Sequence, residues 1–165
     1  MKIVHGTCTD ISSEGKGVVK IGKDIYFVDG LFIGEEADIE VIYSRAGVNF
    51  GKVKKLLKLS KNRIQPKCKV CTSCGGCQYQ QINYETQLLY KSKRVENAIR
   101  RIANNKEVKI LPCIKDESPY YYRNKIQVPI GRDPHGHIVS GFYRSGTHKI
   151  IPVDKCYIED KRAEK

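Results

Sequence analysis

Val18-Val19-Lys20-Ile21-Gly22-Lys23-Asp24-Ile25-Tyr26-Phe27-Val28 is the segment that sets the architecture of the first part of the chain. Two runs of mainly β-branched and aromatic residues, 18–21 and 25–28, flank the short sequence Gly22-Lys23-Asp24. Such residues favour strands, and a three-residue break that contains glycine is typical of a tight turn. The segment therefore predicts an antiparallel hairpin.

Similar short runs surround this hairpin, and glycines separate them. We predict strands at 2–9, 17–21, 24–28, 37–43 and 48–57. Five short strands within 62 residues suit a small closed barrel of the OB type, because closure removes exposed sheet edges. An SH3-like barrel would give a similar pattern. We place this first domain at residues 1–62.

One amphipathic helix is predicted at residues 83–104. Tyr84, Leu88, Val95 and Ile102, with Ala98 or Ile99 between the last two, recur at helical spacing and predict one apolar stripe, which we expect to pack on a sheet. Asn83 is a suitable N-cap.

Antiparallel strands are predicted again over residues 121–153. In 122–130, Ile126, Val128 and Ile130 alternate with polar residues, and 138–144 reads as the return strand of a hairpin. With the helix, these strands form a second predicted domain at 63–165. The fold class is mainly β with one helix (α+β). The charged end of the chain, 159–165, lacks apolar core residues, and we expect a further domain to follow it.

The chain is strongly basic, with 30 Lys and Arg against 18 Asp and Glu and a formal net charge of +12. No acidic residue occurs between Glu40 and Glu85, a gap that holds Arg45, Lys52, Lys54, Lys55, Lys58, Lys61, Arg63, Lys67 and Lys69. A polyanion relieves the repulsion within such a stretch, so nucleic acid is the expected partner. Because no apolar run is long enough to cross a bilayer and no signal segment precedes the strands, we expect a cytoplasmic monomer without a membrane partner.

The most specific motif is Cys68-Lys-Val-Cys71-Thr-Ser-Cys74-Gly75-Gly76-Cys77. Thiolates suit zinc and iron–sulfur clusters, and crowded cysteines in a cytosolic chain indicate metal or redox chemistry rather than disulfides. Zinc sites usually use two Cys pairs far apart in sequence, which this run lacks. Gly75 and Gly76 allow the backbone to approach a bulky group closely. An iron–sulfur cluster is therefore favoured over zinc, with all four crowded thiols as candidate ligands.

Cys68, a five-residue gap and Cys74-Gly75-Gly76-Cys77-Gln78 together resemble the signature of the iron–sulfur (uracil-5-)-methyltransferases of ribosomal RNA. Those enzymes depend on S-adenosylmethionine, form 5-methyluridine and begin with a TRAM domain, an OB-type RNA-binding barrel. The segments 15–19, 25–28 and 31–35 resemble the strand pattern of that barrel. The segments 122–125 and 141–144 resemble the central domain of the family.

The resemblance implies a ligand set for a [4Fe–4S] cluster: Cys68, Cys74, Cys77 and Cys156, the last of which follows the hairpins. Cys71 would then not be a ligand, whereas the motif alone makes it one of four candidate ligands. Cys8 and Cys113 read as ordinary, partly buried residues, since no nearby His or Asp marks either as a nucleophile.

The resemblance also implies an rRNA (or tRNA) substrate. We expect Lys52, Lys54 and Lys55 of the barrel to hold the RNA backbone, and Arg123, Lys125 and Arg144 to lie near a flipped base. In the family, S-adenosylmethionine binds a C-terminal catalytic domain that nothing in these residues supplies. No catalytic residue is predicted, and the chain alone is expected to be inactive. The alternatives are a small iron–sulfur electron carrier or redox sensor, and a zinc-binding RNA chaperone.

Overall fold

The computed structural model describes residues 2–163; expectations that concern Met1, Glu164 and Lys165 lie outside the described residues. The chain forms two compact units. The first, here called the barrel unit, runs to Ile64 and includes Gln81–Ile114. The second, here called the cysteine unit, consists of Gln65–Gln80 and the chain from Lys115 onward.

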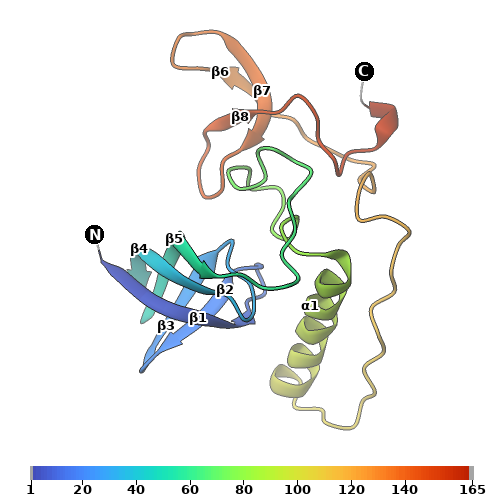
Figure 1. Cartoon of the computed structure of the whole chain (residues 1–165). Coiled ribbons are helices and arrows are strands. Elements are labelled where there is room, and N and C mark those ends of the chain that lie inside the picture. The colour runs from blue at the N-terminus through green and yellow to red at the C-terminus, as the bar shows by residue number, and fades with distance from the viewer. Residues whose placement is uncertain (1, 164–165) are drawn as a thin grey trace. The chain divides into compact units, whose positions relative to one another are not determined.

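Five strands of the barrel unit form a closed barrel, drawn in blue to green in Figure 1. They are β1 (Ile3–Ile11), β2 (Gly17–Ile21), β3 (Asp24–Asp29), β4 (Glu36–Arg45) and β5 (Val48–Lys58). The order around the barrel is β1-β2-β3-β5-β4, with β3 and β5 parallel and the other pairs antiparallel. This architecture is consistent with the predicted OB-type barrel, and each strand overlaps its predicted range.

The predicted hairpin is present, and it supplies much of the barrel core. In β2 and β3, Ile21 pairs with Asp24 and Gly17 with Val28, so the turn lies at Gly22, which has φ +59. Side chains alternate across a strand, so Val19, Tyr26 and Val28 point inward and are at most 1% exposed. Ala37 and Ile39 of β4 complete this core together with Cys8 and Leu31.

A buried ion pair ties the loop before β4 to the segment after β5. Glu35 has no exposed side-chain surface, and Arg63 Nε lies 2.6 Å from its Oε1. Arg63 also donates to the second carboxylate oxygen, Glu35 Oε2, at 2.7 Å and to the carbonyl of Gly30 at 2.7 Å. Backbone N–H groups of Phe32 and Ser60 donate to the same carboxylate. Every lone-pair direction of the buried charge therefore has a donor nearby, as burial of a carboxylate requires.

The helix α1 (Tyr84–Asn97) begins where predicted but ends earlier as a regular α-helix. Asn83 is its N-cap, since the side-chain oxygen accepts from the N–H of Thr86 at 2.9 Å. A π-helical turn, η1 (Ala98–Ile102), follows α1. The expected apolar stripe is only partly right: Leu88 is buried, whereas Val95 and Ile102 are 52% and 86% exposed. Periodicity reports apolar spacing, but it does not show whether a packing partner exists along the whole stripe.

The helix belongs to the barrel unit rather than to the second domain that we placed at 63–165. The chain leaves the barrel unit after Ile64 and returns to it at Gln81. Backbone hydrogen bonds join these two points: Asn83 donates to Asn62, and Ile64 donates to Gln81. The N–H of Ile33, next to the barrel, also donates to the hydroxyl of Tyr90 in α1. These contacts between residues distant in sequence carry the helix with the barrel, and sequence spacing does not reveal them.

The cysteine unit contains a three-stranded antiparallel sheet in the order β6-β7-β8. Its strands are β6 (Ile130–Arg132), β7 (Ile138–Tyr143) and β8 (Ile150–Pro152), and a short 3₁₀ turn, η2 (Lys161–Ala163), follows. The prediction of a strand over 122–130 is wrong except at Ile130. Tyr121 and Arg123 instead donate their N–H groups to Tyr157 and Ile158, which lie far along the chain. Within residues 2–163, no helix is long and apolar enough to span a membrane.

Candidate metal centre

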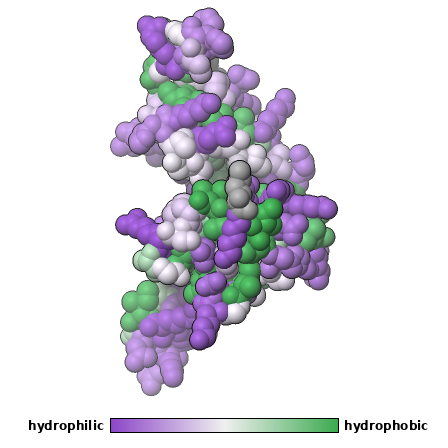
Figure 2. Space-filling model, turned by 90° about the vertical axis from the view of Figure 1, so that its left-hand side faces the viewer, coloured by the Kyte–Doolittle hydropathy of each residue, from purple (hydrophilic) through white to green (hydrophobic). Residues whose placement is uncertain are grey.

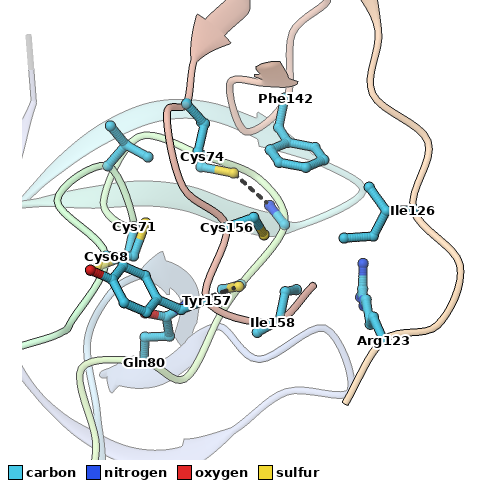
Figure 3. A pocket seen from close by; sticks show the side chains of 14 residues that line it. Cys68, Cys71, Cys74, Gln80, Arg123, Ile126, Phe142, Cys156, Tyr157 and Ile158 are labelled. Carbon is cyan, nitrogen blue, oxygen red and sulfur yellow. Dashed lines mark hydrogen bonds between the residues drawn. The ribbon is translucent and has the colours of Figure 1, made fainter. Parts of the chain in front are cut away.

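Five cysteine side chains line one pocket inside the cysteine unit. Cys68, Cys71, Cys74 and Cys77 come from the loop that precedes α1, and Cys156 follows β8. Figure 3 shows Cys68, Cys71, Cys74 and Cys156 around this space, with Gln80 and Tyr157 beside them. The structure thus brings together all four predicted ligands, Cys68, Cys74, Cys77 and Cys156, and adds Cys71 to the same wall.

Local turns fold the cysteine loop so that its four thiols line one pocket. Cys71 N–H donates to the carbonyl of Cys68 at 3.3 Å, and Cys74 N–H donates to Val70 at 2.8 Å. Such i to i+3 and i to i+4 bonds wind the chain tightly, which suits cysteines spaced three residues apart. The three-residue spacing of the cysteines therefore places successive thiols about one turn of the chain apart.

Backbone contacts fasten the cysteine loop to the β7–β8 hairpin. Gly75 N–H donates to Tyr143 at 2.9 Å, and Ser145 N–H donates to Ser73 at 3.2 Å. A Cβ added at Gly75 would lie 3.2 Å from the Cα of Ser145, whereas one at Gly76 would meet only Cys74 Sγ at 3.5 Å. The close approach that we expected from these glycines is thus, at Gly75, an approach to the hairpin backbone.

The thiols lie in an environment that is both apolar and rich in hydrogen-bond donors. Gly76 N–H donates to Cys74 Sγ at 3.4 Å, and the Gln80 amide donates to Cys77 Sγ at 3.3 Å. Burial raises the pKa of the Cys77 thiol; the Gln80 amide opposes this rise, while Cys74, Cys156 and Cys68 add to it. Cys74, Cys156 and Cys68 therefore lie close enough to Cys77 to disfavour its thiolate form.

The remaining lining is mostly apolar and comes from the C-terminal segments: Ile126, Phe142, Val153, Tyr157 and Ile158. Arg123, which we predicted to bind RNA, also lines this pocket. Its N–H donates to Ile158 and its carbonyl accepts from Asp160, so the backbone holds it at the pocket wall. A guanidinium at this position can offset negative charge on the thiolates.

The pocket thiols are spread around a space and do not meet at one point. Among residues 2–163, no group of three or more His, Cys, Asp or Glu side chains is arranged closely enough to hold a single metal ion. A tetrahedral zinc site needs such convergence. The ligand set at Cys68, Cys74, Cys77 and Cys156 stays a prediction.

The predicted RNA-binding residues fall into two groups. Lys52, Lys54 and Lys55 are exposed on β5, and Lys52 forms an ion pair with Glu40 at 3.4 Å. Lys125 and Arg144 are exposed in the cysteine unit, where Arg144 forms a backbone bridge with Cys74. The first group belongs to the barrel unit and the second to the cysteine unit.

Cys8 and Cys113, which we expected to be ordinary, partly buried residues, both lie outside the pocket. Cys8 is 1% exposed in the barrel core, and burial raises the pKa of its thiol to about 12. Cys113 is half-buried, and its backbone N–H donates to Ser92 Oγ of α1 at 3.1 Å. Because of its high pKa, the Cys8 thiol is not a nucleophile at neutral pH.

Two aromatic clusters add to the predicted site residues, and the sequence singles out only the run 120–122 of the second as a candidate stacking surface. On the barrel, Phe27, Tyr43 and Phe50 lie side by side. In the cysteine unit, Tyr120 and Tyr121 pack near Tyr157, and Lys67 lies 4.4 Å from the centre of the Tyr120 ring. Strict alternation around Tyr26 and Val28 marks Phe27 as outward-facing, so the sequence contains a signal for the barrel cluster. It contains no signal that Tyr157 packs near Tyr120 and Tyr121.

The fold and the pocket define a protein of two units, a small closed barrel and a thiol-lined site. No family model matches the chain. It is 36% identical over 157 residues to an uncharacterised RNA methyltransferase of Clostridium tetani, covering 95% of this chain and 34% of the relative. It is 35% identical over 163 residues to one of Halalkalibacterium halodurans, covering 99% of this chain and 35% of that protein. An RNA methyltransferase of Bacillus cereus is 42% identical over 151 residues, covering 91% and 32%.

The structure is similar to that of Pyrococcus abyssi tRNA (uracil-54, C5)-methyltransferase in complex with S-adenosyl-L-homocysteine. The TM-score is 0.64 at 23% identity, over 97% of this chain and 34% of that one. The two share a fold over this region. The chain spans about a third of the length of the relatives that it matches.

Proposed function

We propose that this chain is the RNA-binding part, with a [4Fe–4S] cluster, of an S-adenosylmethionine-dependent RNA (uracil-5-)-methyltransferase. The observation that carries the proposal is the convergence of Cys68, Cys74 and Cys77 with the distant Cys156 in one pocket. Relatives named as RNA methyltransferases at 35–42% identity support the choice of enzyme. In this proposal the barrel is a TRAM domain.

The residues present fit a cluster better than a single ion. Each iron of a [4Fe–4S] cluster takes its own thiolate, so four thiolates around a space suit it, whereas one zinc ion draws its ligands to a point. When bound, the cluster supplies four iron–thiolate bonds that cross-link the chain. Gly76 N–H and the Gln80 amide hydrogen-bond to the sulfurs of Cys74 and Cys77, and donors of this kind stabilise ligating thiolates.

The proposed role of the cluster is structural. Cys68, Cys74 and Cys77 lie on one segment of the cysteine unit and Cys156 on the other, with the whole of α1 between them. Linking residues about 80 positions apart removes much of the conformational freedom of the unfolded chain. The cluster would thereby hold Arg123 and the hairpin that carries Arg144 in place for RNA.

The RNA-binding part of the proposal rests on charge. The net charge of +12 and the acid-free stretch from Val41 to Tyr84 provide cations for phosphates, among them Lys52, Lys54 and Lys55. Ribosomal or transfer RNA is the proposed substrate of the whole enzyme, and transfer of the methyl group to carbon 5 of uracil is its proposed reaction. We expect the 165 residues alone to bind RNA without methylating it.

Matched cysteine variants test the ligand set. After anaerobic purification, or reconstitution with iron and sulfide, the unmodified chain should contain about four iron and four sulfide per chain. Cys156→Ser should lose most iron and the visible absorbance of the cluster, whereas Cys71→Ser should keep both. Cys113→Ser, which removes a thiol outside the pocket, is the control. Iron loss in Cys71→Ser but not in Cys156→Ser would refute the proposed ligands, and zinc in place of iron and sulfide would refute the cluster itself.

A further inference from the structure

Three aromatic rings form a row across the outer face of the barrel. Phe27 of β3 is in register with Phe50 of β5, and Phe50 is in register with Tyr43 of β4. The ring centres of Phe27 and Phe50 are 5.6 Å apart. Those of Tyr43 and Phe50 are 4.6 Å apart, and their planes differ by only 12°, so these two rings are stacked.

The row faces away from the core. Tyr26 and Val28, on either side of Phe27, are at most 1% exposed and fill the barrel, so Phe27 points outward. Tyr43 is 53% exposed, and a bulge between Val41 and Tyr43 leaves Ile42 equally exposed. Figure 2 shows that green apolar surface is present among purple hydrophilic surface on one side of the molecule. Of the stacked pair, Tyr43 is exposed and Phe50 is half-buried, and neither belongs to the barrel core. Exposed apolar surface of this kind is typical of a binding site.

Cations border the aromatic row. Two residues along the strands from the aromatic row, and therefore on the same face, Lys20 of β2 lies opposite Ile25, and Arg45 of β4 lies opposite Val48. Ile25 and Val48 pair with each other, so Lys20 and Arg45 stand at the two ends of one cross-strand row. Both cations are exposed. On the other side of the aromatic row, Lys52 pairs in register with Asp29.

We propose that Phe27, Phe50 and Tyr43 form a base-stacking site for single-stranded RNA, with Lys20 and Arg45 contacting the adjacent phosphates. The inference rests on the proposed function, which makes RNA the partner, and adds the site and the form of RNA that it takes. Base faces stack on aromatic rings without regard to sequence, and a basic border binds the backbone. An unpaired base can stack on the flat ring face of the Tyr43–Phe50 pair. Bases within a duplex are already stacked on one another, so they are not available to do so.

The lack of tryptophan in the chain allows a direct test. Tyr43→Trp would introduce the sole indole into the full 165-residue chain, at an exposed position. Titration with single-stranded oligouridylate should quench its fluorescence to saturation. An RNA hairpin whose bases are nearly all paired, added at equal phosphate concentration, should quench it much less. Leu89→Trp is the matched control, since Leu89 is 66% exposed and lies on α1 rather than on a strand of the barrel.

Binding measurements separate stacking from charge. By fluorescence anisotropy of a labelled single-stranded RNA, Tyr43→Leu should bind about tenfold more weakly, with an unchanged dependence on salt. Tyr43→Phe, which restores the ring, should recover the lost affinity. Arg45→Gln should instead lower the slope of log affinity against log salt by about one.

The outcomes distinguish this inference from the proposed function. If the unmodified chain binds RNA but Tyr43→Leu binds equally well and the indole at position 43 is not quenched, the stacking site is refuted while the RNA partner stands. Absence of any RNA binding by the unmodified chain refutes both. Quenching that depends on protein concentration without RNA would show a second copy on the row and overturn the inference. Circular dichroism of each variant verifies that the barrel is folded.

Discussion

At the scale of single residues, a buried carboxylate and the buried thiols differ in how many hydrogen-bond donors surround them. Glu35 is fully buried but is surrounded by donors from Arg63, Phe32 and Ser60. Cys8 is just as buried, and burial raises the pKa of its thiol to about 12, so it stays neutral. The pocket cysteines are less enclosed and lie within reach of N–H donors. Burial raises the pKa of the Cys77 thiol as well, but there the Gln80 amide donates to the sulfur and opposes the rise.

Arg63→Ala should destabilise the barrel unit strongly. Removal of one partner leaves the Glu35 carboxylate buried without its main counter-charge, and such losses cost about 3–5 kcal/mol. The free energy of unfolding by urea, followed by circular dichroism, measures the effect.

Lys16→Ala is the control for this measurement, because it removes the exposed ion pair between Lys16 and Asp29. The expected cost is below about 1 kcal/mol. Equal effects of the two substitutions would contradict the assigned role of the buried pair.

At the scale of secondary structure elements, local patterns predicted the barrel strands but not the second unit. The hairpin of β2 and β3 was predictable since its pairing partners are neighbours in sequence. The segment 122–130 alternates like a strand, yet its hydrogen bonds go to residues near 158, which no local pattern records. The pocket shows the same limit. Cys68 to Cys77 form a visible motif, whereas the inclusion of Cys156 depends on tertiary structure and was expected only from the family resemblance.

Gly141 is required where β7 meets β8. A Cβ at this position would lie 1.9 Å from the carbonyl oxygen of Ile151, far closer than atoms can approach. Gly141→Ala should therefore separate the two strands and destabilise the cysteine unit by about 1–3 kcal/mol. Thermal unfolding of the chain reconstituted with iron and sulfide measures the loss.

Ser140→Ala, on the same strand and exposed, is the control and should change stability by less than about 0.5 kcal/mol. An unaltered melting temperature in Gly141→Ala would contradict the close packing of β7 on β8.

At the scale of the whole molecule, the chain enters the cysteine unit twice. It passes from the barrel into Gln65–Gln80, returns to the barrel unit for Gln81–Ile114, and completes the cysteine unit from Lys115 onward. The barrel has its own core, centred on Val19, Tyr26 and Val28. The cysteine unit has a three-stranded sheet of short strands and few buried residues. We therefore expect the barrel to persist alone and the cysteine unit to depend on the cross-link that the proposed cluster would supply.

Iron removal should consequently affect only one unit. In the reconstituted chain, chelation under reducing conditions should abolish hydrogen-exchange protection in residues 65–80 and 115–163. Protection of the barrel strands, residues 3–58, should stay within about twofold. Mass spectrometry of the exchanged peptides resolves the two regions. Retained protection around Cys156 after complete iron loss would show that the pocket holds its shape without a metal group.

The interrupted path of the cysteine unit also orders events during synthesis. The loop from Cys68 to Cys77 is complete well before Cys156 has been translated, while the lining of the pocket draws on both. At about 5–20 residues per second, the last thiol emerges roughly 4–16 s after the third predicted ligand. During those seconds the four thiols of the loop, three of them predicted ligands, would be exposed on a nascent chain whose five barrel strands have already been translated. An oxidant present in that interval would react with them before Cys156 is available.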